Sequence, residues 1–295
     1  MRLHDQSTPP SARRRAARLT ALGGAALLVL TGCEHGDFVN GYLPQGVTEG
    51  ADRVTTLWVW AWIALLTVGA LVWGLIIWSM VAYRRRKGDN ELPVQLRYNV
   101  PIEILYTVVP IFMIAVFFFW TAKEEEALVD TSTPADVHIN VVGKQWSWDF
   151  NYLDDEVHEV GLQAVMDGQP GAEETIPTLY LPVGKRVEFY VTSRDVIHSF
   201  WVPAFLTKLD MIPGRVNTFQ VVPTQEGMFK GKCAELCGAY HSQMLFNVKI
   251  VSQAEYDAHM AELEAKGQTG LLPNGVSRQQ LMPGQELLLP ENARD

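Results

Sequence analysis

The chain has 295 residues, of which 48% are hydrophobic, and a formal net charge of −9. From residue 122 onward, 25 acidic residues stand against 13 basic ones, so this part alone carries a formal charge of −12. So acidic a segment argues against a nucleic-acid partner and favours a basic protein partner. The long apolar runs are confined to the first 122 residues, which separates a membrane-associated part from a soluble one.

Residues 1–32 have the pattern of an export signal. Arginines at Arg13–Arg15 and Arg18 form a positive region, and the apolar stretch Leu19–Leu30 follows. The run ends in Leu-Thr-Gly-Cys33, which resembles the bacterial lipobox and implies cleavage and lipidation at Cys33. The alternative is an ordinary signal anchor that happens to end in cysteine. With a lipobox, the mature chain begins at Cys33 outside the cell.

Two membrane spans are expected after a connector over residues 33–53. Residues 54–83 contain no charge and five tryptophans, several of them near the ends, where interfacial aromatic belts lie. A helix of this length measures about 45 Å, more than the ~30 Å hydrocarbon core of a bilayer. A second span is expected over residues 102–122, because no charge occurs between Ile104 and Ala122.

The loop between these spans sets the orientation. Residues 84–101 begin with Arg-Arg-Arg-Lys and also contain Arg97. Cytoplasmic loops carry an excess of positive charge, so this loop is predicted to be cytoplasmic. The two spans then form a hairpin with both ends outside, and everything after Lys123 lies on the outer face of the membrane.

Glu103 lies at the cytoplasmic end of the second span. Ionisable groups at the edge of a span can mark ion or proton routes when they face a protein neighbour. The alternative is a structural role, in which an acid beside Pro101 complements the positive end of the helix dipole.

Residues 123–253 are expected to form an all-β domain. Short β-branched and aromatic runs separated by Gly and Pro predict an antiparallel sandwich or barrel. Aromatic residues at 146, 148, 150 and 152 alternate, so they are predicted to share one face of a strand. The acidic segment 154–175 is interpreted as an excursion between strands. Residues 254–295 are expected to be a short helix followed by an irregular tail. The strand-like runs are Val137–Val142, Lys144–Tyr152, Thr178–Leu181, Arg186–Thr192, Asn217–Val222 and Phe246–Val251.

A group of soft metal ligands marks the candidate site. Cys233, Cys237, His241 and Met244 fall within twelve residues, and His198 lies upstream at the end of an expected strand. Thiolate, imidazole and thioether together favour copper over hard cations.

Four interpretations of this loop compete. A Cys233–Cys237 disulfide suits an oxidising compartment but leaves both histidines and Met244 unexplained. A structural zinc site would use two Cys and two His, yet methionine is a poor zinc ligand. A mononuclear blue-copper site needs only one cysteine. A dinuclear copper site uses every residue: two bridging thiolates, one histidine on each copper, and a thioether and a carbonyl in the remaining positions.

These motifs resemble subunit 2 of cytochrome c oxidase. The resemblance covers Cys-x-Glu-x-Cys-x-x-x-His-x-x-Met at 233–244, Asp-Val-Ile-His-Ser at 195–199 and the preceding hairpin, from about Leu57 to Val251. It implies a two-helix transmembrane hairpin followed by a cupredoxin-like Greek-key sandwich or barrel. It also implies a dinuclear copper centre that accepts electrons from cytochrome c and passes them to a haem of the large catalytic subunit. That subunit reduces oxygen to water, coupled to proton pumping.

The resemblance also assigns roles to single residues. It implies His198, Cys233, Cys237, His241 and Met244 as side-chain ligands of copper. Glu235 is implied as a further copper ligand through its backbone carbonyl, with its side chain facing a magnesium ion shared with the large subunit. Trp146 matches the residue that receives the electron from the cytochrome. Glu103 matches the acid at the mouth of a proton-uptake channel.

The implied partners are cytochrome c or a tethered c-type cytochrome, the large haem-copper subunit 1, subunit 3 and a cytochrome bc complex in a supercomplex. The haems belong to the partner subunit. The chain departs from the family's compact pattern in segment 154–175 and in the tail after Glu262. It also has Arg194 next to Asp195, in a docking rim that the family usually keeps acidic. Two other functions remain alternatives: a membrane-anchored copper-delivery or storage protein, and a quinol-oxidase subunit with an empty site.

Overall fold

The computed structural model describes residues 38–86, 88, 92, 95–166 and 172–274. The expected export signal, Cys33 and the last part of the expected tail lie outside these residues. The chain divides into two compact units, residues 1–43 and 44–295. All elements named below belong to the second unit.

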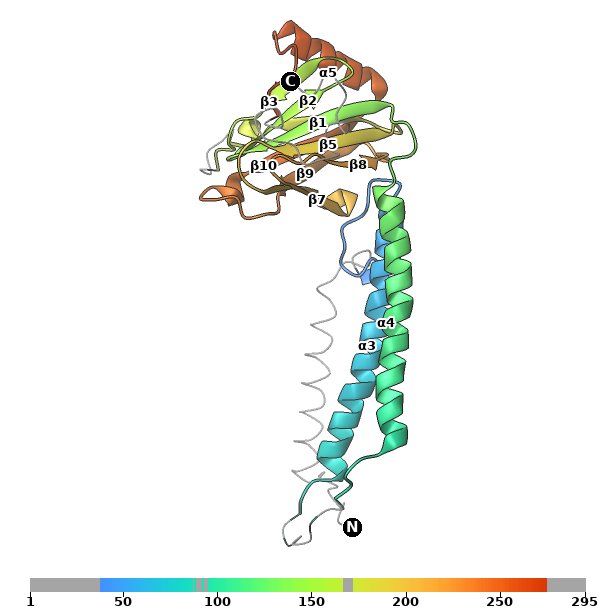
Figure 1. Ribbon diagram of the computed structural model, residues 1–295. Helices are drawn as coiled ribbons and strands as arrows, with labels where there is room; N and C mark the ends of the chain where they lie inside the picture. Colours follow the sequence, from blue (N-terminus) through green and yellow to red (C-terminus); the bar gives the residue numbers. More distant parts are fainter. Residues whose placement is uncertain (1–37, 87, 89–91, 93–94, 167–171, 275–295) are drawn as a thin grey trace, which may run out of the picture. The chain divides into compact units, whose positions relative to one another are not determined.

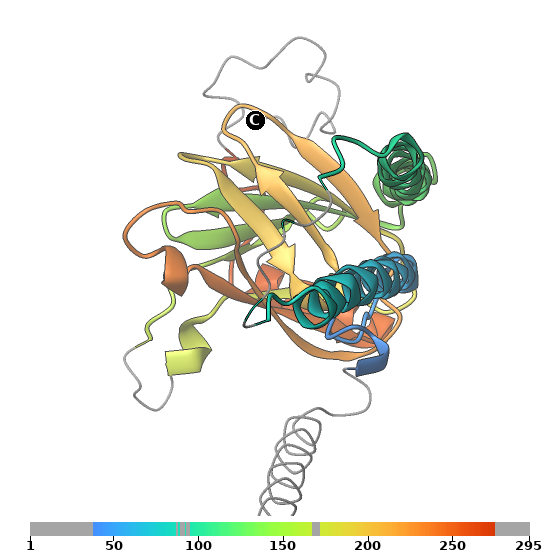
Figure 2. The same ribbon diagram turned by 90° about the horizontal axis from the view of Figure 1, so that it is seen from below.

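Two long helices open the second unit (Figure 1). Helix α3 spans Ala51–Ala82 and helix α4 spans Val100–Val129, and both are long and apolar enough to cross a membrane. Helix α4 continues for seven residues past the expected end of its apolar run at 122. The added stretch Lys123–Val129 contains Lys, three Glu, Ala and Leu, which are strong helix formers. Figure 2 shows α3 and α4 as two separate helices, with α4 seen nearly end-on.

The start of α4 explains why Glu103 occurs there. The side chain of Asn99 accepts a hydrogen bond from the Ile102 N–H (3.4 Å), and the Glu103 carboxylate accepts one from the Asn99 N–H (2.8 Å). This reciprocal arrangement satisfies two backbone donors of the helix N-terminus, as a capping box does. Glu103 therefore has a structural role in the helix cap.

The β-domain is a sandwich of two five-stranded sheets, with strand orders β3-β2-β1-β5-β8 and β4-β10-β9-β6-β7 (Figure 1). Strand β2 is buried at all six residues, and the buried apolar side chains of the two sheets pack into one common core. The strands of the first sheet are β1 Val137–Lys144, β2 Ser147–Tyr152, β3 Val157–Val160, β5 Val187–Ser193 and β8 Asn217–Val221. Those of the second are β4 Thr178–Pro182, β6 His198–Val202, β7 Thr207–Met211, β9 Gly227–Cys233 and β10 Leu245–Val251.

The prediction of a two-layer all-β domain is confirmed, but the sheets are not purely antiparallel. Strand β1 pairs with β5 in parallel, and β10 pairs with β4 in parallel. A parallel pair needs a crossover connection. The chain supplies it by moving to the other sheet: it passes through β4 of the second sheet on its way from β3 to β5. Hydrophobic alternation does not reveal such a crossover.

Aromatic rings dominate the core between the sheets. Phe200 of β6 lies between Phe246 of β10 (ring centroids 4.9 Å apart) and Phe189 of β5 (5.5 Å). Trp148 of β2 contacts Phe246 at 4.9 Å and has no exposed surface. Each buried aromatic side chain removes a large apolar area from water, so this cluster is a major source of stability.

The aromatic alternation over 146–152 is broken at its first member. Trp148, Phe150 and Tyr152 are fully buried in β2, but Trp146 is not part of that strand. It lies with Gln145 in the two-residue connection between β1 and β2, where it is half-buried. The expectation that Trp146 shares a strand face with the others was therefore wrong, because the chain turns at this point.

The 154–175 segment contains more regular structure than expected. It includes strand β3 and the short 3-10 helix η1 at Ala172–Thr175. Strands β7 and β9 were also not predicted. Strand β9 contains two Gly and two Lys in seven residues, so it lacks the β-branched composition by which strands are recognised.

Helix α5, at Gln253–Ala265, leads into a segment that covers the free edge of β3. The Gly270 N–H donates to the Glu156 carbonyl (2.7 Å), and the His158 N–H donates to the Gln268 carbonyl (3.0 Å). Next to it, the Asn151 amide exchanges two hydrogen bonds with the backbone of Leu272 (2.8 and 3.0 Å). The described part of the tail, residues 267–274, forms no helix or strand and packs against the sheet, as expected of an irregular tail on the surface.

Candidate metal centre

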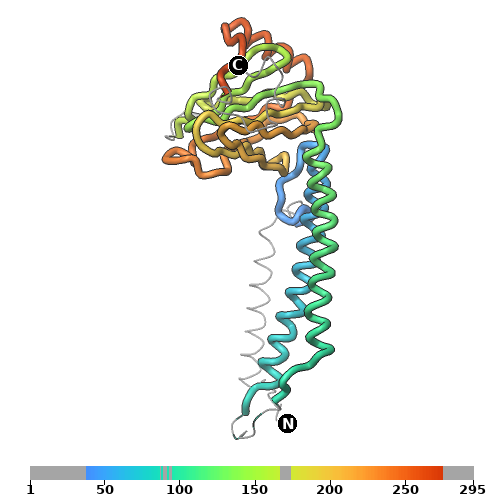
Figure 3. Tube along the Cα trace, in the orientation of Figure 1, coloured from blue at the N-terminus to red at the C-terminus, as the bar shows by residue number. Residues whose placement is uncertain are grey.

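The metal loop, residues 233–244, connects β9 to β10. Figure 3 shows this connection projecting beyond the strands. Cys233 is the last residue of β9 and pairs with Phe200 of β6 across the sheet. His198 is the first residue of β6. The pairing of β6 with β9 therefore brings the distant histidine to the start of the loop.

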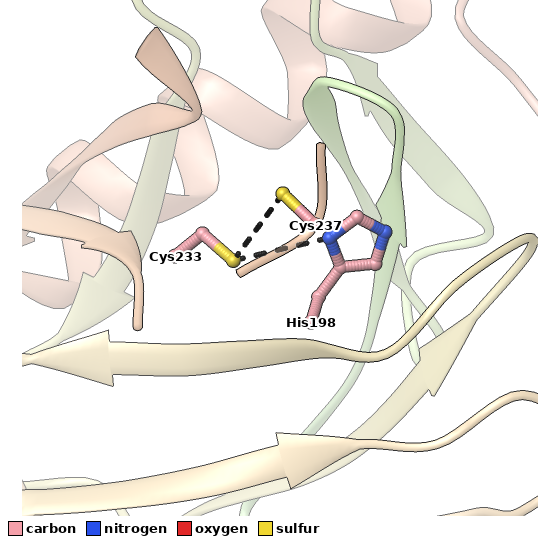
Figure 4. A group of neighbouring side chains, drawn as sticks. All are labelled: His198, Cys233 and Cys237. Atoms are coloured by element: carbon pink, nitrogen blue, oxygen red, sulfur yellow. Dashed lines mark hydrogen bonds between the residues drawn. The ribbon is translucent and has the colours of Figure 1, made fainter. Parts of the chain in front are cut away.

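Five side chains converge here, and we call His198, Cys233, Cys237, His241 and Met244 the donor cluster. The Cys233 sulfur lies 3.8 Å from His198 Nδ1 and 3.9 Å from the Cys237 sulfur (Figure 4). The Cys237 sulfur lies 3.5 Å from His241 Nδ1 and 3.7 Å from the Met244 sulfur. The two sulfurs thus occupy the middle of the cluster, with one histidine next to each.

A backbone carbonyl joins the cluster. The Glu235 carbonyl oxygen lies 3.2 Å from the Cys233 sulfur. His198 and Met244 have no exposed surface, and Cys233 and Cys237 are 3–4% exposed. Both cysteines are free thiols. His241 is half-buried. This set of two thiols, two imidazoles, a thioether and a carbonyl fits soft copper better than zinc.

The surroundings act on the two thiols in opposite directions. Burial raises the pKa of Cys233, but the His198 ring and the backbone of Glu235 and Ser199 outweigh it, so the net pKa of Cys233 is lowered. Burial and the neighbouring Cys233 raise the pKa of Cys237. A bound cation removes this conflict, since metal ligation stabilises both thiolates.

His198 is held by groups outside the cluster. Its Nε2 lies 2.8 Å from Asp195 Oδ1, which leaves Nδ1 directed at the Cys233 sulfur. A carboxylate on the second ring nitrogen is a common support for metal-binding histidines. Gly143 lies against the same ring: a Cβ on it would come within 3.0 Å of the His198 Cδ2. Trp148 also contacts the cluster, because its Nε1–H donates to the Met244 carbonyl (3.4 Å).

Trp146 lies directly on the metal loop. Its Nε1–H donates to the Cys237 carbonyl (3.2 Å), and its ring makes an edge contact with Tyr240 (centroids 5.0 Å apart). Since Trp146 is half-buried, one part of the indole contacts the loop while another part reaches the surface.

The remaining predicted residues lie elsewhere. Glu235 belongs to the metal loop and is half-buried, whereas Glu103 lies in the first turn of α4. Arg194 is 3.6 Å from the carboxylate of Asp149, which is 1% exposed and also bonds Lys144. Arg194 therefore neutralises a buried acid.

Sequence reasoning missed the residues that support the cluster. Asp195 was part of the motif, but its contact with His198 was not predicted, and Gly143 and Gln145 were not singled out as supports. Gly143 sits two residues before Gln145 in the segment Gly-Lys-Gln-Trp. A glycine inside a strand pattern was the available signal, because it marks close approach of another group.

Fold and site together define a class of protein: a β-sandwich with a buried soft-ligand metal site, preceded by two helices able to cross a membrane. The family model described as cytochrome c oxidase subunit II, periplasmic domain, matches residues 137–251. A probable cytochrome c oxidase subunit 2 from Streptomyces avermitilis is 47% identical over 91% of this chain and 92% of its own length. The subunit 2 of Mycobacterium bovis is 34% identical over 86% of this chain and 83% of its own.

The chain therefore belongs to the cytochrome c oxidase subunit 2 family, and its β-domain is the cupredoxin-like domain of that family. Family members are subunits of an oxidoreductase complex. Among solved structures, the periplasmic domain of subunit II of cytochrome oxidase from Bradyrhizobium japonicum has 34% sequence identity. The similarity covers 45% of this chain and 97% of that one, with a TM-score of 0.40. The two apolar helices and the periplasmic domain fit a two-pass membrane protein with its β-domain on the outer face.

Proposed function

We propose that this protein is the electron-accepting subunit of a respiratory cytochrome c oxidase. It accepts electrons from cytochrome c at a dinuclear copper centre and passes them to a haem of the large subunit, where oxygen is reduced to water and protons are pumped. The convergence of two cysteines, two histidines and Met244 around one pair of sulfurs carries the proposal. A mononuclear site leaves one of the cysteines without a role.

In this proposal His198, Cys233, Cys237, His241, Met244 and the Glu235 carbonyl hold two copper ions. The copper pair supplies a site that takes up and releases one electron. The chain's own residues keep that site dry and rigid: His198 is fixed by Asp195, and Cys233, Cys237 and Met244 are almost fully buried. Rigid ligands limit the rearrangement that accompanies a change of charge, which favours electron transfer over substrate chemistry.

Trp146 is the proposed point of electron arrival. Its indole reaches the surface on one side and hydrogen-bonds the carbonyl of Cys237 on the other. This contact provides a short bonded route from the surface to Cys237, one of the residues that would hold copper.

The contacts with other subunits are proposed on the family's pattern. The Glu235 side chain faces a magnesium ion shared with large subunit 1, which also holds the haems, and subunit 3 completes the complex. Glu103 marks the mouth of a proton-uptake channel. Its helix-capping role is compatible with this, because the carboxylate retains a second oxygen besides the one that bonds Asn99.

The donor is proposed to be cytochrome c or a tethered c-type cytochrome, with a cytochrome bc complex as its source in a supercomplex. Segment 154–175 supports contact with such a donor because Gln163 donates a hydrogen bond to Gln243 of the metal loop (2.9 Å). Its side chains Leu162 and Met166 are 72% and 51% exposed. These exposed apolar side chains near the metal loop are suited to contact with the surface of a donor protein.

The protein is proposed to reside in a bacterial cell membrane, with residues 1–32 as export signal and a lipid anchor on Cys33. The proposed spans lie over 54–83 and 102–122, with 84–101 as the cytoplasmic loop. Mass spectrometry of the purified protein tests the anchor. A lipidated N-terminus at Cys33 supports it, and an uncleaved Met1 terminus contradicts it.

Metal analysis and electron paramagnetic resonance of the purified full-length chain test the copper centre. The expected result is two coppers per chain sharing one unpaired electron in the oxidised state. One copper, or zinc, per chain would contradict the proposal. A chain that gives up its copper to a chelator and shows no electron-transfer activity would instead favour a delivery or storage protein.

A further inference from the structure

Gln145 connects three parts of the site that are far apart in sequence. It lies in the connection between β1 and β2, next to Trp146. Its backbone N–H donates to Asp195 Oδ2 (2.7 Å), and its side-chain Nε2 donates to the Cys237 carbonyl (2.8 Å). A single residue thus joins the metal loop, the segment before β6 and the tryptophan.

The Cys237 carbonyl receives two side-chain donors. Besides the Gln145 amide, the Trp146 Nε1–H binds the same oxygen (3.2 Å). The packing is close here: a Cβ on Gly238, whose φ is +124°, would lie 3.1 Å from both the Gln145 amide and the Trp146 ring. Only a glycine fits comfortably at this position, so the glutamine and the indole are pressed against one peptide of the metal loop.

The Asp195 carboxylate extends the connection to a second ligand. One of its oxygens accepts the Gln145 N–H, and the other contacts Nε2 of His198. Gln145 is therefore linked to Cys237 through its side chain and to His198 through one carboxylate, although it contacts neither a sulfur nor an imidazole itself.

We propose that Gln145 is a positioning residue for electron acceptance, whose amide holds the Cys237 carbonyl against the Trp146 indole. This proposal rests on the proposed function. In the step concerned, one electron passes from the reduced donor through the indole to the oxidised copper pair, and no bond is made or broken. The amide fixes the separation between indole and loop, on which the rate of this step depends.

The exposed position of Gln145 raises a competing role, contact with the donor protein. The two roles affect different kinetic constants. A positioning residue changes the rate at saturating donor, whereas a docking residue changes KM for the donor.

The test uses the complete oxidase carrying Gln145→Ala or Gln145→Glu. The glutamate keeps the size of the side chain but replaces the amide donor with an acceptor, which the Cys237 carbonyl repels. Gln220→Ala is the matched control, because Gln220 also donates to a backbone carbonyl, that of Thr133 (3.0 Å), from strand β8. Trp146→Phe reports separately on the proposed route.

Copper content, the paramagnetic spectrum and turnover with the native reduced donor are measured for each variant. Both Gln145 variants are expected to retain two coppers and an unchanged KM for the donor. Their rate at saturating donor is expected to fall roughly three- to tenfold, about the factor that corresponds to one lost hydrogen bond. The Gln220 control is expected to match the wild type.

Three outcomes would overturn the proposal for Gln145: an unchanged rate, a change in KM alone, or loss of copper in both variants, which would make the residue a support of the site itself. An unchanged rate in Trp146→Phe would instead contradict the proposed route. A wild-type chain without two coppers would contradict the proposed function.

Discussion

Cys237 contacts the other donors through its sulfur and the two neighbouring side chains of the β1–β2 connection through its carbonyl. Its sulfur is within 3.9 Å of Cys233, His241 and Met244, and its carbonyl accepts from Gln145 and Trp146. Removing this sulfur would therefore disturb both halves of the proposed dinuclear centre, whereas removing the Met244 sulfur would leave both thiols in place.

Cys237→Ser is expected to abolish the dinuclear centre. A hydroxyl is a poor bridging ligand for copper, so the variant should bind at most one copper and lose the shared-electron spectrum. Metal analysis and paramagnetic resonance measure this. Met244→Leu is the control of similar volume, which should keep two coppers and shift the reduction potential. An unchanged spectrum in Cys237→Ser would disprove the bridging role.

Gly143→Ala is expected to displace His198. The added Cβ would lie 3.0 Å from the His198 ring, inside a fully buried site that cannot relax easily. We expect a loss of about 1–3 kcal/mol in the free energy of unfolding, typical of overpacking, together with an altered copper spectrum. Gly69→Ala is the control, because among the described residues no atom beyond the adjacent backbone of its own helix lies within 4 Å of an added Cβ. Equal behaviour of the two variants would argue against the close packing of Gly143.

At the scale of single elements, strand β2 carries a buried acid. Asp149 is 1% exposed and lies between Lys144 (2.5 Å) and Arg194 (3.6 Å), with the Gly161 N–H as a further donor (3.2 Å). A buried carboxylate is tolerated only when it is paired and hydrogen-bonded, so these partners hold β1, β2 and the segment before β6 together.

Lys144→Met is expected to destabilise the domain by about 1–3 kcal/mol, because it leaves the buried carboxylate short of one donor. Lys185→Met is the control: Lys185 is 3.8 Å from Asp136, and both side chains are about half exposed. Such surface pairs contribute about 0–1 kcal/mol. Chemical denaturation of both variants measures the difference. Equal losses would show that the Asp149 pairing contributes no more than a surface pair.

Helix α5 is attached to β4 through a buried histidine. The His259 ring stacks on Tyr180 with centroids 3.6 Å apart, its Nε2 is buried without a partner, and its Nδ1 is 3.8 Å from Glu262. Burial lowers the pKa of His259 below its ordinary value of 6.5, and Lys266 and Lys249 act in the same direction. Glu262 opposes them.

This shift predicts a pH dependence of stability. Since the folded state disfavours the charged imidazole, the unfolded state binds the proton more readily, and stability rises with pH in this range. The contribution of His259 to the free energy of unfolding is thus expected to be complete above pH 6.5. It should diminish as the pH falls toward the lowered pKa of His259. Thermal unfolding between pH 5 and 8 should show that the unfolding temperature falls less at acid pH for His259→Phe than for the wild type. Parallel curves for the two proteins would contradict this role.

Most strands and the candidate ligands could be predicted from the sequence, but the contacts that support those ligands could not. The runs at β1, β4, β5, β8 and β10 follow β-branched and aromatic composition, and the candidate ligands, which the structure brings together, follow from the chemistry of Cys, His and Met at fixed spacing. Strand β9 was missed because Gly and Lys replace β-branched residues. The contacts of Gln145 and Asp195 with the cluster depend on which loops meet at one end of the sandwich, and this information is not present in local sequence patterns.

At the scale of the whole molecule, helices and β-domain are connected by short, bonded segments. The Val47 N–H donates to the Ala204 carbonyl (3.0 Å) and the Thr224 N–H to the Val47 carbonyl (2.8 Å), so the stretch before α3 is attached to the sandwich. Arg53 of α3 bonds Glu124 of α4 (3.1 Å), which joins the two helices. These contacts join the stretch before α3 to the sandwich, and α3 to α4.

A donor that uses segment 154–175 should be sensitive to its apolar side chains. The triple variant Leu162→Ser, Val165→Ser, Met166→Ser is expected to raise KM for the native donor severalfold while copper content stays at the wild-type level. These side chains are 72%, 46% and 51% exposed, so folding should not suffer. Met228→Ser, at 53% exposure on β9, is the control. An unchanged KM would exclude this surface from donor contact.

The segment that follows α5 has a consequence for any shortened version of the chain. Residues 268–270 hydrogen-bond the backbone of β3, which is otherwise an open sheet edge, and Leu272 bonds the side chain of Asn151 on the adjacent strand β2. An open edge invites pairing with another chain. A protein ended after Ala265 is therefore expected to self-associate through β3, even though every donor-cluster residue is still present in it.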